Sequence, residues 1–176
     1  DTALNTIVET LDRVKMSAEA VRRVFVVETM GRYCGYLALM SGLAAGAEKA
    51  YLNEEGITLD KLNDDVRWLK ESFSAGRELV LAMRNEKANE HYTTDFIAGL
   101  FEEESHGLYD VRSTVIGHQQ QGGVPTPFDR LLATRLVSRA LRLVTEQLDA
   151  GTDESFYLGL VEAKVRAQPL AGMMGQ

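Results

Sequence analysis

Residues 24–35 (VFVVETMGRYCG) constrain the fold of this chain more than any other stretch. The first four are β-branched or aromatic and are bounded by charge, which is typical of a short strand buried on both faces, as in a parallel sheet. A glycine turn follows at Gly31, and a helical pattern begins at about Cys34. α/β proteins build ligand sites from a strand, a glycine turn and a helix in this order. Gly31 and Gly35 let the backbone approach a ligand, the helix N-terminus favours an anion, and Arg32 adds positive charge.

Helical and strand-like patterns alternate along most of the chain. Helices are predicted at 1–20, 34–46, 58–76, 93–107 and 126–148, and strands at 24–28, 50–53, 78–83 and 111–116. This alternation predicts an α/β fold, with a mainly parallel sheet flanked by helices and joined by right-handed crossovers. Residues 156–160 and 164–168 are expected to form a β-hairpin after the last helix. A VPTP segment at 124–127 is the predicted lobe boundary, which divides the chain into 1–123 and 124–176.

Composition limits the class of protein and its partners. A length of 176 residues, with 45% hydrophobic and 26% charged residues, fits a soluble globular chain of one domain, or one and a part. The net charge of −7 argues against nucleic acid or an anionic membrane as a partner, so anion binding would depend on a local cluster of arginines. One cysteine excludes an internal disulfide and fits the cytoplasm. Because the chain begins at Asp1 within a helical pattern and without an initiator Met, we expect a fragment.

Four motifs relate the chain to a known family. They are ETMGRYCGYLA at 28–38, LAMRNE at 81–86, YTTDF at 92–96 and GHQQQGG at 117–123. In order and spacing they resemble the phosphofructokinases, most closely the C-terminal half of the long, duplicated eukaryotic chains. The likeness extends from Asp1 to about Leu148.

The resemblance implies the glycolytic transfer of the ATP γ-phosphoryl group to fructose 6-phosphate, with Mg²⁺, in an oligomer of four or more subunits. It implies that 1–123 is the sugar-phosphate lobe and that 124–176 belongs to the adjoining nucleotide-type lobe. The family's ATP-phosphate loop, its catalytic Asp and its Mg²⁺ carboxylate precede the segment matched here. We therefore expect no catalytic residue and no metal ligand in this chain, and no ATP or Mg²⁺ bound by it alone.

The resemblance also supplies candidate contacts to a fructose phosphate. Arg23 and Arg112 match arginines that reach across a subunit interface to the 6-phosphate, which suits the planar fork of Arg. His118 matches a contact to phosphate or sugar oxygens, and Glu86 an acceptor of sugar hydroxyls. The remaining candidates are neighbours of these groups, with Met30 and Gly31 expected to touch the sugar mainly through the backbone: Met30, Gly31, Arg32, Gln119, Gln120 and Gln121.

Without the resemblance, the same residues have ordinary interpretations. Each arginine would be a surface charge beside a sheet, His118 a buried structural histidine, and Glu86 a solvated carboxylate. Cys34 is expected to be a packed small residue, since no motif pairs it with a base. Residues 102–104, three glutamates, are expected to form a solvated helix face.

One position bears on which half of the duplicated enzyme this is. Catalytic halves of the family carry Arg where this chain has Gln121, and the pair Gln120 and Gln121 is similar to the regulatory half, which binds fructose 2,6-bisphosphate. Arg32 favours the catalytic half, because some regulatory halves have Gly there. We expect the regulatory half. The alternatives are a catalytic half that binds fructose 6-phosphate and a packing module with no competent site of its own.

Overall fold

The computed structural model describes residues 1–18 and 21–172, so the predicted role of Met173 and Met174 lies outside the described residues. The chain divides into two compact units, Asp1–Val124 and Pro125–Gln176. Each unit is described by itself below. Among the helices of the described residues, none combines the length and the apolar character needed to cross a bilayer.

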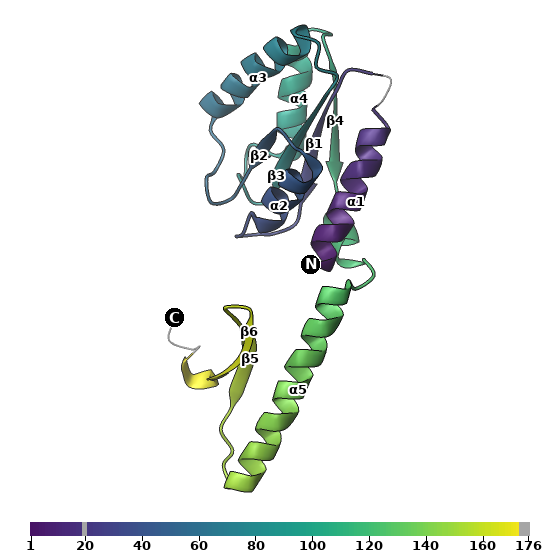
Figure 1. Cartoon of the computed structure of the whole chain (residues 1–176). Helices are drawn as coiled ribbons and strands as arrows, with labels where there is room; N and C mark the ends of the chain where they lie inside the picture. Colours follow the sequence, from purple (N-terminus) through teal and green to yellow (C-terminus); the bar gives the residue numbers. More distant parts are fainter. Residues whose placement is uncertain (19–20, 173–176) are drawn as a thin grey trace. The chain divides into compact units, whose positions relative to one another are not determined.

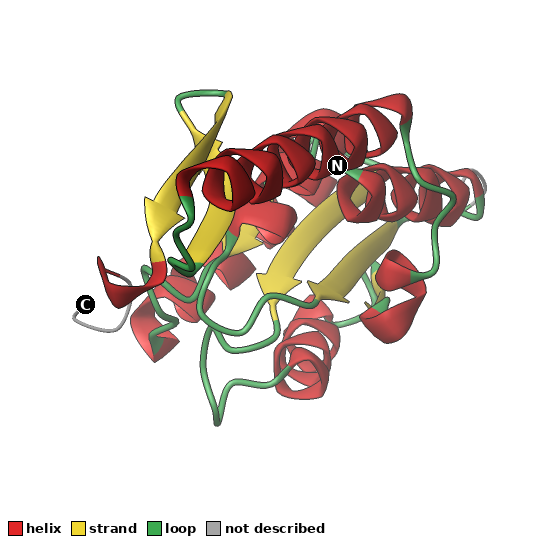
Figure 2. Cartoon of the chain, turned by 90° about the horizontal axis from the view of Figure 1, so that it is seen from below, coloured by secondary structure: helices red, strands yellow, loops and turns green. Residues whose placement is uncertain are grey.

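The first unit is built on a four-stranded parallel sheet (Figures 1 and 2). Its strands are β1 (Arg23–Thr29), β2 (Lys49–Tyr51), β3 (Leu79–Asn85) and β4 (Asp110–Val115), in the order β2-β3-β1-β4. The prediction of a mainly parallel sheet is confirmed, and residues 24–27 are buried on both faces as expected. The second strand ends at Tyr51, two residues earlier than predicted, because Leu52 already belongs to the turn.

Helices cover both faces of this sheet (Figure 2). They are α1 (Thr2–Met16), α2 (Tyr36–Ala45), α3 (Leu59–Ser74) and α4 (Thr94–Ser105). Alternate side chains of β1 point to opposite faces, as strand geometry requires. Val24 and Val26 pack in one core cluster with residues of α3 and α4, whereas Phe25 and Val27 pack in the other with residues of α1 and α2. All residues of both clusters belong to the first unit.

The helix boundaries follow local capping chemistry where the sequence supplies it. Thr58 caps α3, since its hydroxyl accepts the Lys61 N–H, and Thr93 caps α4 by accepting the Phe96 N–H. The first helix ends at Met16 rather than near residue 20, and α2 begins at Tyr36 rather than at Cys34. The later start of α2 leaves Cys34 in the preceding loop.

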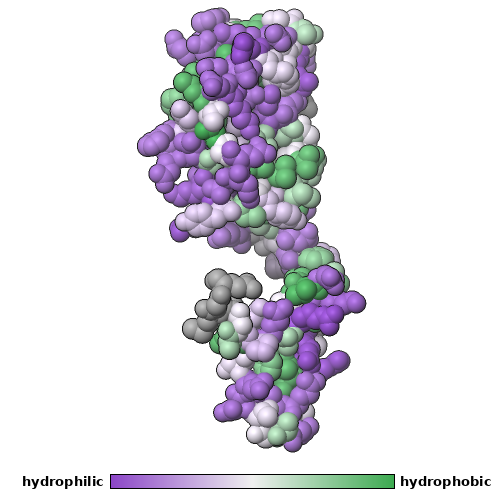
Figure 3. Space-filling model, turned by 90° about the vertical axis from the view of Figure 1, so that its left-hand side faces the viewer, coloured by the Kyte–Doolittle hydropathy of each residue, from purple (hydrophilic) through white to green (hydrophobic). Residues whose placement is uncertain are grey.

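The second unit consists of one long helix and a hairpin. Helix α5 (Pro127–Ala150) is followed by β5 (Phe156–Val161) and β6 (Lys164–Pro169), which pair antiparallel, and by the short 3-10 helix η2 (Leu170–Gly172). The predicted helix and hairpin are confirmed. Glu162 and Ala163 form the hairpin turn with φ values of 51° and 61°, the left-handed conformation that two-residue turns require. Figure 3 shows apolar residues exposed on this unit, where no residue of α5 is buried.

Candidate functional site

Three segments meet at the carboxyl ends of the two central strands. They are the loop 30–35 after β1, residues Asn85 and Glu86 at the end of β3, and the 3-10 helix η1 (Gly117–Gln121) after β4. The register pairs Thr29 with Asn85, so the two strands end side by side. This is the edge at which parallel α/β sheets usually bind ligands.

Side chains from the other two segments hold the start of the loop. The Met30 N–H donates to Gln120 Oε1 at 3.0 Å, and the Gly31 N–H donates to Glu86 Oε1 at 3.3 Å. The Asn85 side-chain amide donates to the carbonyl of Gly31. These contacts join residues 54 to 90 positions apart, and they give the loop a defined conformation before any ligand binds.

Gly31 is required by the geometry of this loop. Its φ is +137°, a region that other residues rarely adopt, and a Cβ there would lie 2.6 Å from the carbonyl oxygen of Cys34. The glycine therefore serves the turn itself. Close approach of a ligand is not needed to explain it.

The N-terminus of α2 is capped by a carboxylate. Gly35 N–H donates to both oxygens of Glu54, at 2.8 and 3.0 Å. A Cβ at Gly35 would lie 2.7 Å from Glu54 Oε2 and 2.9 Å from Leu52, so this glycine makes room for Glu54. A carboxylate of the protein thus already lies at this helix N-terminus, where the sequence predicted that a ligand anion would be favoured.

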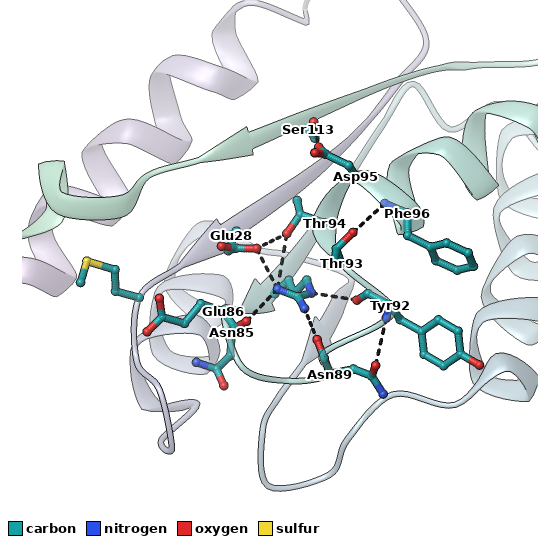
Figure 4. Close-up of polar contacts among 12 residues, drawn as sticks. Glu28, Asn85, Glu86, Asn89, Tyr92, Thr93, Thr94, Asp95, Phe96 and Ser113 are labelled. Atoms are coloured by element: carbon teal, nitrogen blue, oxygen red, sulfur yellow. Dashed lines mark hydrogen bonds and ion pairs between the residues drawn. The ribbon is translucent and has the colours of Figure 1, made fainter.

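A buried arginine, Arg84, lies near the same carboxyl edge and contacts β1, α4 and the loop after β3. Arg84 is only 2% exposed, and its guanidinium lies 2.7 Å from Glu28 Oε2, which also accepts the hydroxyl hydrogen of Thr94 (Figure 4). Its remaining N–H groups reach the carbonyls of Glu86, Asn89 and Tyr92. Burying a charge is costly unless it is paired and hydrogen-bonded, and this arginine is both.

A cavity of about 430 Å³ opens beside this arginine. Its lining comes from the ends of β1, β3 and β4, the loop after β3 and the start of α4: Glu28, Arg84, Glu86, Lys87, Asn89, Glu90, Thr93, Thr94, Asp95 and Val115. No role was predicted for Arg84 from the sequence, although it lies within the LAMRNE motif. The sequence did contain a signal for its burial, since Arg84 directly follows the apolar run of the strand predicted at 78–83.

A family model described as phosphofructokinase matches residues 1–144. The chain belongs to the phosphofructokinase family. The ATP-dependent 6-phosphofructokinase of platelet type from Homo sapiens is 46% identical over 186 residues, covering 100% of this chain and 24% of that protein. The muscle type from Mus musculus is 52% identical over 149 residues, covering 84% of this chain and 19% of that protein. The chain thus spans about a quarter, 24%, of the length of the first of these relatives.

Solved structures agree with this assignment. The structure is similar to phosphofructokinase from Saccharomyces cerevisiae, with a TM-score of 0.88 and 36% identity over 98% of this chain and 24% of that chain. A pyrophosphate-dependent phosphofructokinase from Marinobacter aquaeolei, 17% identical, has a TM-score of 0.66 over 100% of this chain and 47% of that chain, and so shares the fold. The predicted phosphofructokinase fold is confirmed.

The phosphofructokinase residues predicted to bind sugar phosphate do not all lie at one edge. Met30, Gly31, Arg32, Glu86 and residues 117–121 lie at the carboxyl edge. Arg23 begins β1, six residues before the strand ends, which corresponds to about 20 Å at the usual rise of a strand. It pairs with Asp110 at 3.5 Å. Arg112 lies opposite Phe25 on the edge strand β4 and is exposed.

The exposed members of η1 differ from the buried one. His118, Gln119 and Gln121 are exposed, and His118 Nδ1 lies 3.4 Å from Gln121 Oε1. The alternative of a buried structural histidine is wrong. Gln120 is 2% exposed and accepts the Met30 N–H, so its side chain is engaged within the protein. The N–H groups of Met30 and Gly31, expected to face a sugar, are likewise engaged by side chains of the protein.

One further expectation needs correction. Cys34 is exposed rather than packed, because it lies in the loop before α2. The glutamates of α4 lie at the surface as expected, with Glu102 and Glu103 exposed and Glu104 partly exposed. Two of them also make contacts within the protein, since Glu102 accepts the N–H of Val111 and Glu104 pairs with Lys70 at 3.0 Å. The hydrogen bond from Lys70 lowers the pKa of Glu104.

Proposed function

We propose that this chain is part of an ATP-dependent 6-phosphofructokinase and contributes a binding site for a fructose phosphate, namely the effector fructose 2,6-bisphosphate. The observation that carries the proposal is the composition of η1. It presents the exposed His118 and Gln121, with three neutral glutamines in a row and no arginine. Amides can hydrogen-bond sugar and phosphate oxygens but add no net charge.

Polar groups of two kinds are available to such a ligand at this edge. Glu86 can accept sugar hydroxyls through its second oxygen, since Oε1 already accepts the Gly31 N–H. Arg32 is exposed in the adjoining loop and can donate to a phosphate. The second carboxylate nearby, Glu54, is committed to the cap of α2. The side chains of Met30 and Arg32, rather than the backbone, are then the loop's contacts to the sugar.

The 6-phosphate needs more positive charge than this edge supplies. Because Arg23 and Arg112 lie along the strands and away from the carboxyl edge, we propose that they serve the site of a neighbouring subunit. Arg112 on the open edge strand is exposed, as such a role requires. The site would be complete only in an oligomer.

We assign the ATP and Mg²⁺ sites, and the catalytic base, to the rest of the protein. Among residues 1–18 and 21–172, no group of three or more His, Cys, Asp or Glu side chains is placed to hold a metal ion. The whole enzyme would phosphorylate fructose 6-phosphate in the glycolysis of the cytoplasm, and this chain by itself would be inactive. A coupled assay with saturating ATP, Mg²⁺ and fructose 6-phosphate should stay at background for the isolated chain. Turnover that co-purifies with it would contradict this assignment.

Calorimetric titrations of the full-length protein test the proposed ligand. The native protein should bind fructose 2,6-bisphosphate more tightly than fructose 6-phosphate. Gln121→Arg should tighten binding of the monophosphate, because a bidentate fork is placed next to His118. Gln121→Lys is the matched control, since it adds the charge without the fork and should tighten binding less.

The catalytic half remains the second candidate, favoured by the positive charge at Arg32. A native protein that prefers the monophosphate, and that loses turnover when His118 is replaced by Ala, would establish it. If the native protein bound neither sugar, the remaining candidate would be a packing module with no competent site of its own.

A further inference from the structure

Gln120 stands apart from the other polar residues of η1. It is 2% exposed, whereas its neighbours Gln119 and Gln121 are exposed. Glutamine is rarely fully buried, and burying its amide is unfavourable unless it is hydrogen-bonded. Three identical side chains in sequence thus occupy two different environments.

The buried amide has a specific partner. Gln120 Oε1 accepts the N–H of Met30 at 3.0 Å, across 90 positions of sequence. Met30 is the first residue after β1, so this bond ties η1 to the start of the loop 30–35. The start of η1 is also held in place, because Ile116, directly before it, is buried and donates its N–H to the carbonyl of Glu28.

The bond lies between two groups of candidate ligand contacts. On one side are His118 and Gln121, the exposed residues of η1. On the other are Arg32 in the loop and Glu86, which itself holds Gly31. A ligand that touches both groups requires a fixed separation between them, and misplacement by about 1 Å weakens such sites strongly.

We propose that Gln120 is a positioning residue of the fructose-phosphate site, which holds Met30 so that the loop and η1 keep the separation a bound sugar phosphate needs. This inference rests on the proposed function. Gln120 acts through Met30 and does not touch the ligand, in contrast to the sequence-based prediction that it binds the sugar.

Two variants of the full-length protein break this hydrogen bond in different ways. Gln120→Met keeps the length of the side chain but removes the acceptor oxygen. Gln120→Asn keeps the amide but is one methylene shorter, so its oxygen cannot reach the Met30 N–H. Gln119→Asn makes the same shortening at the exposed neighbour.

Affinity for fructose 2,6-bisphosphate, measured by calorimetry, is the first readout. We expect Gln120→Asn and Gln120→Met each to weaken binding about tenfold or more. Hydrogen–deuterium exchange of peptides that contain Met30, measured without ligand, is the second. Exchange should rise in Gln120→Asn and stay at the native level in Gln119→Asn. If Gln120 only filled space, its replacement would lower the stability of the protein and would change neither the affinity nor the exchange at Met30.

The outcomes are distinguishable. If the native protein binds the bisphosphate and Gln120→Asn binds it equally tightly, the positioning role is wrong while the proposed function stands. Weaker binding in Gln120→Asn and Gln120→Met, with native exchange at Met30 in both, also overturns it. If the native protein binds no fructose phosphate, the proposed function fails and the inference fails with it.

Discussion

The two compact units differ in where they place their apolar side chains. The first unit buries two clusters, one on each face of its sheet, which include side chains such as Leu69, Phe73 and Leu81 at 1% exposure or less. In the second unit no residue of α5 is buried, and several large apolar side chains are more than half exposed: Phe128, Leu131, Val137, Leu141, Val144 and Leu148. Exposed apolar surface of this extent normally marks an interaction surface.

Among residues 1–18 and 21–172, therefore, only those of the first unit form a buried core. The chain covers 24% of the length of a relative with 46% identity, so much of the family's sequence lies outside it. We infer that the rest of the protein covers the apolar residues of α5. The expected difference in folding between a unit with its own core and a unit without one can be tested by experiment.

The largest effect is expected when the two units are produced separately. Residues 1–124 should fold and unfold cooperatively in urea, because both faces of their sheet are covered. Residues 125–176 should show no cooperative transition, since a helix and a two-stranded hairpin bury too little apolar area. Circular dichroism during urea titration makes the comparison. Cooperative unfolding of 125–176 alone would contradict it.

A smaller difference should separate a buried from an exposed ion pair within the first unit. Glu28→Ala leaves Arg84 as an unpaired charge at 2% exposure, so it should lower the free energy of unfolding by about 3 kcal/mol, the low end for broken buried pairs because Glu28 is 20% exposed. Asp64→Ala is the control. It breaks the exposed pair with Arg67 and should cost less than about 1 kcal/mol. Equal costs in urea titrations of the chain would refute the distinction.

The smallest effects concern two buried tyrosines of the first unit. The hydroxyl of Tyr51 donates to Asp65 at 2.8 Å, so Tyr51→Phe should cost about 1.5–3 kcal/mol, as for hydrogen bonds to charged groups. The buried hydroxyl of Tyr109 has no hydrogen-bond partner among the described residues. Tyr109→Phe should therefore change stability by less than about 0.5 kcal/mol, or increase it. A large loss in Tyr109→Phe would show that its hydroxyl is satisfied.

The same tyrosines predict sensitivity to alkali. Burial raises the pKa of Tyr109 to about 12, and burial together with Asp65 raises the pKa of Tyr51 further. An unfolded tyrosine ionises near pH 10, so the unfolded state loses these protons first. Stability should be unaffected by these groups below pH 10 and should fall as the pH rises from about 10 towards 12. Each Phe variant should reduce this fall, and an unchanged slope in both would contradict the assignment.

Local patterns in the sequence determined most of the fold. The apolar run at 24–27 and the alternation of helices and strands are properties of neighbouring residues, and the structure confirms what they predict. The hairpin near the C-terminus is of the same kind. Such features can be predicted because a strand or helix begins with side chains only a few positions apart. The motifs placed the chain in its family for a similar reason.

Tertiary structure alone decided how the candidate site is built. Glu54 caps α2 from 19 positions away, and Gln120 holds Met30 from 90 positions away, so no periodicity reveals either contact. The burial of Arg84 depends likewise on Glu28, which an adjacent strand supplies. Each of these polar groups could equally be a ligand contact or an internal hydrogen-bond partner when only the sequence is known. Which one it is depends on the partner that the folded chain brings within about 3 Å of it.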